Sequence, residues 1–232
     1  MPMPDAVLIP TCQGPITSRF QPPGSKSLTN RAVIVAAAAA GTSRLTGVLD
    51  SEDTRVMAAG LARLGVDISA DWEAAQMTIE GCGGRLPAAR AELDCRASGT
   101  TMRFLTALCS LGTGPFRLDG TARMRQRPIG DLIDALSQLG LNAHAESPGR
   151  CPPVTIAGGP PHASEKACLS IRGDISSQFA SGLAMIGPCL PNGLQLAFSG
   201  ELVSWPYLEM TDRVMQAFGA ITKLAPDTWE IS

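Results

Sequence analysis

The chain of 232 residues is 44% hydrophobic and 17% charged, which is the composition of an ordinary globular protein that can bury a full core. Its net charge of −2 supplies no overall field that would recruit nucleic acid or an anionic membrane, so an anion site must come from local geometry. The chain has only two histidines, and none of its seven cysteines forms a CxxC pair, which argues against a zinc protein and favours a reducing, cytoplasmic compartment. No apolar run reaches the ~20 residues that a membrane helix needs, which argues against a membrane protein.

Three segments of the chain repeat one predicted layout, in which a hydroxyl-rich turn opens a helix of small residues, a strand ends at a glycine, and a second helix is closed by another glycine. The first helices are predicted to begin near Ser27, Thr100 and Ser177, and the strands after them to end near Gly47, Gly120 and Gly200. The second helices are predicted over 53–64, 128–139 and 207–218, each followed by a glycine, which ends helices readily. A last strand is expected over 229–231.

The second helix of the middle copy shows the helical pattern well. Its apolar residues recur at helical spacing, at Ile129, Leu132, Ile133, Leu136 and Leu139. Pro128 suits the first turn of this helix, because its missing N–H would have no partner there. No linker separates the copies. The sequence therefore predicts one α/β domain of three repeated units, each with two helices and a small sheet, around one shared core with pseudo-threefold organisation.

The first helix of the first copy carries a candidate anion site. If the units pack in parallel, three helix amino termini converge on one face, and their free N–H groups favour anions. The charge of Lys26 opposes the helix dipole, so its placement suggests a negative ligand. Arg31 lies four residues after Ser27, on the same helix face. Hydroxyl caps and a solvated basic face are the alternative explanations of these residues.

A second basic cluster precedes the second helix of the middle copy. Arg123, Arg125 and Arg127 alternate, and in an extended segment they would project to one side, as bidentate binding of a carboxylate or phosphate requires. A role in solubility is the alternative. The equivalent turn of the last copy contains Ser204 and Tyr207, and the tyrosine ring either lines a ligand or covers the core.

Five short motifs, in this order and at these intervals, resemble those of the 5-enolpyruvylshikimate-3-phosphate (EPSP) synthases. They are PGSKSLTNRA (23–32), GTTMR (99–103), RQRPIG (125–130), SSQF (176–179) and SWPY (204–207). The resemblance covers most of the chain, and five spaced motifs are more specific than any one alone. The sequence departs from the family pattern at Ala97, Phe104 and Trp205.

The resemblance implies one lobe of the two-lobed EPSP synthase fold, with three repeated α/β units that each hold two helices and a small mixed sheet. It implies an enzyme of aromatic amino acid biosynthesis that transfers the enolpyruvyl group of phosphoenolpyruvate to shikimate 3-phosphate without a cofactor. It also implies the following roles: Lys26, Ser27 and Arg31 hold shikimate 3-phosphate; Lys26 also faces phosphoenolpyruvate; Ser176, Ser177 and Ser204 bind the shikimate phosphate; Gln178 reaches both ligands; Tyr207 lines the ring; and Gly99 and Arg127 bind phosphoenolpyruvate.

Members of the family are nearly twice as long as this chain, and the resemblance implies that the second, carboxy-terminal lobe supplies the acid and base carboxylates. We therefore expect 21–232 to form the shikimate 3-phosphate-binding lobe, 1–20 to join the missing lobe, and the chain alone to bind this substrate without turnover. The alternatives are a non-catalytic ligand-binding or interaction domain of the same fold, an enolpyruvyl transferase acting on a nucleotide sugar, and an RNA-binding relative, which the net charge disfavours.

Overall fold

Three α/β units follow one another in the computed structural model, which describes residues 6, 8, 10–20, 22–157, 159, 166–174 and 176–232. Unit one contains α1 (Lys26–Ala38), β1 (Ala40–Thr46), α2 (Glu52–Arg63), β2 (Asp67–Asp71) and β3 (Gln76–Cys82). Unit two contains β4 (Ala91–Asp94), α3 (Gly99–Leu108), η1 (Cys109–Leu111), β5 (Phe116–Asp119), η2 (Met124–Gln126), α4 (Gly130–Gln138), β6 (Asn142–Ser147) and β7 (Cys151–Ala157). Unit three contains β8 (Ala167–Arg172), α5 (Ser177–Ile186), η3 (Gly187–Cys189), β9 (Leu194–Ser199), α6 (Trp205–Ala217), β10 (Thr222–Leu224) and β11 (Thr228–Ile231).

The predicted repeat is confirmed, and most of its element boundaries agree with the structure. β1, β5 and β9 each end at the residue before the predicted glycine, and α1, α3 and α5 begin within one residue of the predicted starts. The second helix of unit two is shorter than predicted. The N–H of Ile129 donates to the Arg150 carbonyl at 3.0 Å, so the chain is still outside the helix there and α4 begins at Gly130. Pro128 therefore precedes the helix instead of opening it.

Each unit builds one sheet. The strand orders are β1-β3-β2, β4-β5-β7-β6 and β10-β11-β9-β8, and the parallel pairs are β4–β5 and β8–β9. Units two and three thus have the expected mixed sheet, whereas the sheet of unit one is antiparallel throughout. Within the part of the chain that the structure describes, unit one has no strand in the position of β4 and β8, so β1 lies at the edge of its sheet.

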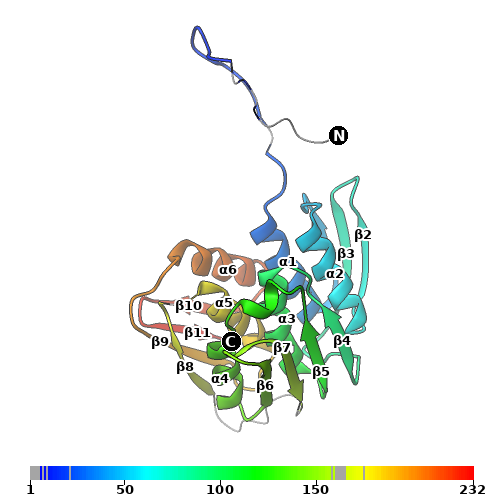
Figure 1. The fold of residues 1–232 in the computed structure, drawn as a ribbon, viewed down its shortest axis with the longest axis vertical. Helices are drawn as coiled ribbons and strands as arrows, with labels where there is room; N and C mark the ends of the chain where they lie inside the picture. Colours follow the sequence, from blue (N-terminus) through cyan, green and yellow to red (C-terminus); the bar gives the residue numbers. More distant parts are fainter. Residues whose placement is uncertain are drawn as a thin grey trace.

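The first helices of the three units form the centre of the fold. α1, α3 and α5 contact one another, and α2 and α6 lie against them from outside, with the sheets farther out (Figure 1). Small side chains allow this close packing. A Cβ on Gly182 of α5, for example, would lie only 3.3 Å from the Cβ of Ala107 in α3. The packing holds the three helices together, so their ends have fixed relative positions.

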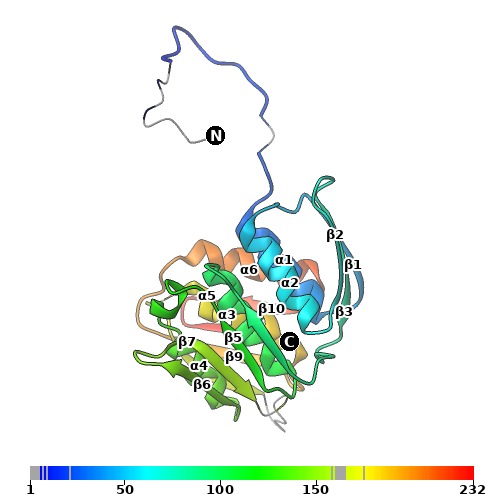
Figure 2. The same ribbon diagram turned by 45° about the vertical axis from the view of Figure 1, so that its right-hand side comes forward.

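The segment before α1 runs out from the folded body, as both ribbon views show (Figures 1 and 2). Residues 10–20 have no regular secondary structure and are exposed, including the large apolar side chains of Ile16 and Phe20 at 73% and 80% exposure. None of the helices in the described residues is both long enough and apolar enough to cross a lipid bilayer.

Candidate functional site

A cleft of about 590 Å³ lies where the amino-terminal ends of α1, α3 and α5 meet. Nine of the ten predicted site residues line it: Lys26, Ser27, Arg31, Arg127, Ser176, Ser177, Gln178, Ser204 and Tyr207. The tenth, Gly99, lies against the side chain of Arg127, where a Cβ at position 99 would come within 2.2 Å of the Arg127 Nη1 atom. The lining residues come from all three units, and the two that lie farthest apart in the sequence, Lys26 and Tyr207, are separated by 181 positions (207 − 26).

The cleft is positively charged. Its lining contains the four cationic side chains of Lys26, Arg31, Arg103 and Arg127 and no carboxylate. Lys26 does have an acidic neighbour outside the lining, because its Nζ atom lies 3.0 Å from Oδ2 of Asp53 in the first turn of α2. The Lys26 side chain remains half exposed, so this ion pair is open to solvent and weak.

Arg31 connects three helices at the floor of the cleft. Its Nε donates to Thr211 Oγ1 of α6 at 2.6 Å, its Nη2 to Ser181 Oγ of α5 at 3.4 Å, and its Nη1 to the Ser27 carbonyl of α1 at 3.0 Å. The guanidinium also lies over the rings of Phe104 and Tyr207, at 5.3 and 5.6 Å. The side chain is only 2% exposed, and burial lowers the pKa of Arg31 to about 10, which leaves it charged at neutral pH.

Arg103 was not singled out as a site residue by the sequence. Its Nη1 donates to Oε1 of Gln178 at 2.7 Å and to the Gly99 carbonyl at 3.3 Å, and its guanidinium lies 5.2 Å from the ring of Phe179. The available signal was its spacing of four residues from Gly99, the same spacing that relates Arg31 to Ser27. In both pairs the arginine folds back onto the carbonyl of the residue four positions earlier.

The serines of the third unit occupy the turns before α5 and α6. Ser176 caps α5, because its Oγ accepts the N–H of Gln178 at 3.3 Å. Ser204 precedes α6 with φ of 61°, a left-handed conformation that a residue with a Cβ seldom adopts. Its hydroxyl makes no capping hydrogen bond. Strained backbone is often found at functional sites, and Ser204 lines the cleft.

The prediction for the arginine-rich turn is corrected by the structure. The segment is not extended, because Met124–Gln126 forms the short helix η2 and the arginines leave it in different directions. Arg123 donates to Gln126 at 3.3 Å, and Arg125 donates to both carboxylate oxygens of Asp119 at 2.9 and 2.7 Å. Of the three arginines, Arg127 alone lines the cleft.

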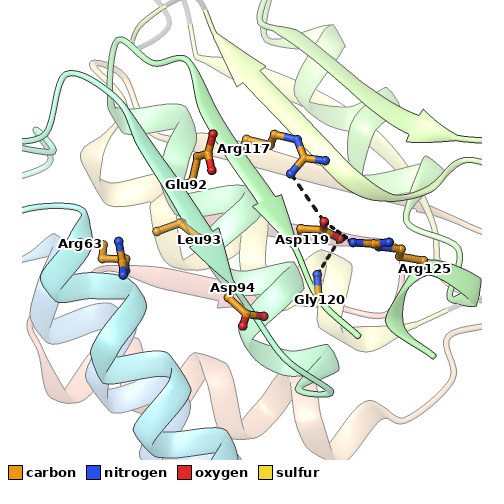
Figure 3. A pocket seen from close by; sticks show the side chains of 8 residues that line it. All are labelled: Arg63, Glu92, Leu93, Asp94, Arg117, Asp119, Gly120 and Arg125. Carbon is orange, nitrogen blue, oxygen red and sulfur yellow. Dashed lines mark hydrogen bonds and ion pairs between the residues drawn. The ribbon is translucent and has the colours of Figure 1, made fainter. Parts of the chain in front are cut away.

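A second polar cleft of about 430 Å³ lies over β4 and β5 (Figure 3). It contains the three arginines Arg63, Arg117 and Arg125 and three carboxylates, so its charges balance. Asp119 lies between two of these arginines, and its ion pairs with Arg125 at 2.7 Å and Arg117 at 3.5 Å hold the pKa of the Asp119 carboxyl below its usual value (Figure 3). The excess positive charge therefore distinguishes the first cleft as the candidate anion site.

Comparison with known proteins finds a protein family whose model matches most of this chain. The family model described as EPSP synthase (3-phosphoshikimate 1-carboxyvinyltransferase) matches residues 10–232. A 3-phosphoshikimate 1-carboxyvinyltransferase of Paraburkholderia phymatum is 44% identical over 200 residues, which are 85% of this chain and 45% of that protein. One of Methanospirillum hungatei is 42% identical over 208 residues, which are 89% of this chain and 47% of that protein.

Solved structures show the same relation. The EPSP synthase of Acinetobacter baumannii is similar with a TM-score of 0.76 and 25% identity, over 91% of this chain and 46% of that one. An enolpyruvyl transferase of Streptomyces tendae shares the fold with a TM-score of 0.59 at 19% identity, over 90% of this chain and 46% of that one. The chain thus spans about half the length of the proteins that it matches.

Proposed function

Because this chain belongs to the EPSP synthase family, we propose that it binds shikimate 3-phosphate as the amino-terminal half of an enzyme that transfers the enolpyruvyl group of phosphoenolpyruvate to this substrate. The observation that carries the proposal is the unbalanced charge of the cleft, with four cations and no carboxylate in its lining. Buried cations without acidic partners are costly, and a phosphorylated, carboxylate-bearing ligand would supply the missing negative charge.

The roles proposed for the individual residues are those that the family resemblance implies, and the presence of nine of these ten residues in the lining of one cleft supports them. Ser176, Ser177 and Ser204 would bind the phosphate, since they bring two hydroxyl-bearing turns and the amino terminus of α5 to the cleft. Lys26, Ser27 and Arg31 would hold the remainder of shikimate 3-phosphate, with Tyr207 along the ring. Gly99 and Arg127 would bind phosphoenolpyruvate, Lys26 would face it, and Gln178 would reach both ligands. The close contact between Gly99 and Arg127 supports pairing these two roles.

The proposed reaction needs one group to protonate the methylene carbon of phosphoenolpyruvate and another to deprotonate the attacking hydroxyl. The lining of the cleft offers no carboxylate for either step, and Asp53 beside it is already paired with Lys26. We therefore assign the proton transfers to a second lobe, which makes this chain a substrate-binding half without turnover.

The same proposal divides the chain. Residues 21–232 would be the substrate-binding lobe and 1–20 would pack on the second lobe. Exposed Ile16 and Phe20, on a segment that leaves the body, support this division. The remaining part of the prediction, for residues 1–5, 7 and 9, lies outside the described residues.

Isothermal titration calorimetry tests the binding. We expect heat on titration with shikimate 3-phosphate and much weaker binding of unphosphorylated shikimate and of inorganic phosphate, because each has only part of the recognised chemistry. Adding phosphoenolpyruvate to the bound chain should release no phosphate until the carboxy-terminal half of a related EPSP synthase is added. An absence of heat at millimolar shikimate 3-phosphate would contradict the binding proposal, and phosphate release by the chain alone would contradict the assignment of chemistry to the second lobe.

The pH dependence of binding should reflect two titrations. A phosphate monoester takes up its second proton near a pKa of about 6, so affinity should fall as the pH falls through about 6. Burial lowers the pKa of both Arg31 and Arg103 to about 10, so positive charge, and with it affinity, should be lost as the pH rises through about 10. Calorimetric titrations in buffers across this range should give an affinity for shikimate 3-phosphate that is highest and nearly constant around neutral pH. Affinity that rises continuously toward alkaline pH would contradict the charge-based account.

A further inference from the structure

The amide of Gln178 is held at both ends by side chains of α3. Its Oε1 accepts from Arg103 Nη1 at 2.7 Å, and its Nε2 donates to Thr100 Oγ1 at 3.2 Å. Gln178 belongs to α5, so this contact joins two units across the cleft. The oxygen and nitrogen of an amide have nearly the same shape, and their assignment depends on the partners they meet.

We propose that Arg103 is a positioning residue that fixes the Gln178 amide with its NH2 group available to an anionic ligand. A guanidinium has five N–H donors and no acceptor, so the group beside it must be the amide oxygen. The NH2 group is thereby turned the other way, where Thr100 takes one of its two hydrogens. The second hydrogen remains for a ligand in the cleft. Without Arg103 the amide could turn over and present its oxygen, which an anion repels.

Arg103 is itself held firmly enough for this role. Its side chain is 9% exposed, packs on the ring of Phe179 and donates to the Gly99 carbonyl. Among the described residues its Nε is buried without a hydrogen-bond partner, and none of its partners is a carboxylate. A buried cation left without a counter-charge destabilises a fold. Its retention in the cleft is explained if its charge and geometry serve ligand binding.

The inference rests on the proposed function for its ligand, but its first test needs none. In the ligand-free chain, two-dimensional NMR should show distinct, slowly exchanging side-chain amide protons for Gln178. Arg103→Met, which keeps apolar contact with Phe179 and removes the donors, should shift these signals and speed the exchange of the protons with solvent, whereas Arg123→Met, at an exposed arginine outside the cleft, should leave both unchanged. Unaltered Gln178 signals in Arg103→Met would overturn the positioning role whatever the chain binds.

The second test is a double-mutant cycle on shikimate 3-phosphate affinity, measured by calorimetry. Arg103→Met and Gln178→Ala should each weaken binding about tenfold, the value of one hydrogen bond to a charged group, and the double variant should be much less than about 100-fold weaker, because most of the effect of Arg103 passes through Gln178. Arg103→Lys, which retains a donor, should recover part of the loss. If Arg103→Met weakens binding by the same factor with and without Gln178, the arginine acts independently and the inference is wrong. If the unmodified chain does not bind shikimate 3-phosphate at all, the proposed function fails, while the NMR test of the amide still decides the positioning.

Because Arg103→Met could also loosen the fold, thermal unfolding of each variant accompanies both tests. We expect the Arg103→Met midpoint to stay close to that of the unmodified chain, since the variant removes a buried charge along with its hydrogen bonds. Arg103→Lys provides the check if that midpoint falls: it keeps the charge, and Gln178 signals and affinity between those of the unmodified chain and Arg103→Met would support the positioning role. Gln178 amide protons that exchange with solvent as fast in Arg103→Lys as in Arg103→Met would overturn it.

Discussion

Arg31→Met is expected to weaken shikimate 3-phosphate binding by about 100-fold, which corresponds to the loss of charged hydrogen bonds worth roughly 3 kcal/mol. Three of the five N–H groups of a guanidinium are used in the hydrogen bonds from Arg31 to Thr211, Ser181 and the Ser27 carbonyl. The other two remain for a ligand, in a position that these bonds fix. Calorimetry gives the affinity, with Arg44→Met as the matched control, because Arg44 lies on exposed β1 and donates to Gln76 instead of facing the cleft.

The same substitution should change stability far less than affinity. The pKa of Arg31 is lowered in the folded state, so the fold disfavours the protonated form, and this cost is present at all pH values below about 10. Methionine removes that cost and fills similar space. Thr211 and Ser181 lose the arginine as a donor but keep the hydrogen bond that already joins them at 2.8 Å. We expect a midpoint of thermal unfolding within a few degrees of the original. Binding that is lost only in step with unfolding would contradict a ligand role for Arg31.

Local rules were sufficient to predict the repeat and most of the cleft. Glycines with left-handed dihedrals close the second helices, at Gly65, Gly140 and Gly219, and serines cap the first helices, as at Ser25 and Ser98. These signals depend on residues near one another in the chain. Once the three helix starts were recognised as equivalent, parallel packing brought Ser27, Thr100 and Ser177 to one site.

What the sequence could not predict depends on contacts between distant residues. Nothing local indicates that Arg125 meets Asp119 while Arg127 meets the cleft, because the short helix η2 turns them apart. The partner of Lys26 was also hidden, since Asp53 comes to it from the first turn of another helix. The role of Arg103 depends on Gln178, which lies 75 positions further along the chain.

Gly81 is a further residue whose close contact with a neighbouring element only the structure reveals. In sequence it is an ordinary strand glycine, but β3 passes the carboxyl end of α1 so closely that a Cβ at this position would lie 2.2 Å from the Ala39 carbonyl oxygen and 2.6 Å from that of Ala36. Both obstacles are backbone atoms, which cannot rotate away as a side chain would. Just beyond β3, the N–H of Gly83 donates to the carbonyl of Ala39, which caps α1, at 2.8 Å, and the N–H of Gly84 donates to the carbonyl of Ala38, the last residue of α1, at 2.9 Å.

Gly81→Ala is therefore expected to lower the free energy of unfolding by about 3 kcal/mol, because β3 must move away from α1 and lose these bonds. For a chain of this length the midpoint of thermal unfolding should fall by roughly 6–12 °C. Gly41→Ala is the matched control. Gly41 pairs with Gly81 across β1 and β3, has φ of +79° and has no atom within 4 Å of an added Cβ, so only backbone strain of about 1 kcal/mol should appear.

Urea unfolding of the two variants, fitted with a common m value, separates close contact from backbone strain. If Gly41→Ala were as destabilising as Gly81→Ala, glycine would be required at both positions for its dihedral freedom, and the contact with α1 would carry no special weight. Neither glycine lines the cleft, so the fraction of each variant that remains folded should bind shikimate 3-phosphate with unchanged affinity. Gly81→Ala should thus lower stability without lowering affinity, and Arg31→Met should lower affinity without lowering stability. This pair of results would show that α1 serves the fold through its contact with Gly81 of β3 and the site through its own residue Arg31.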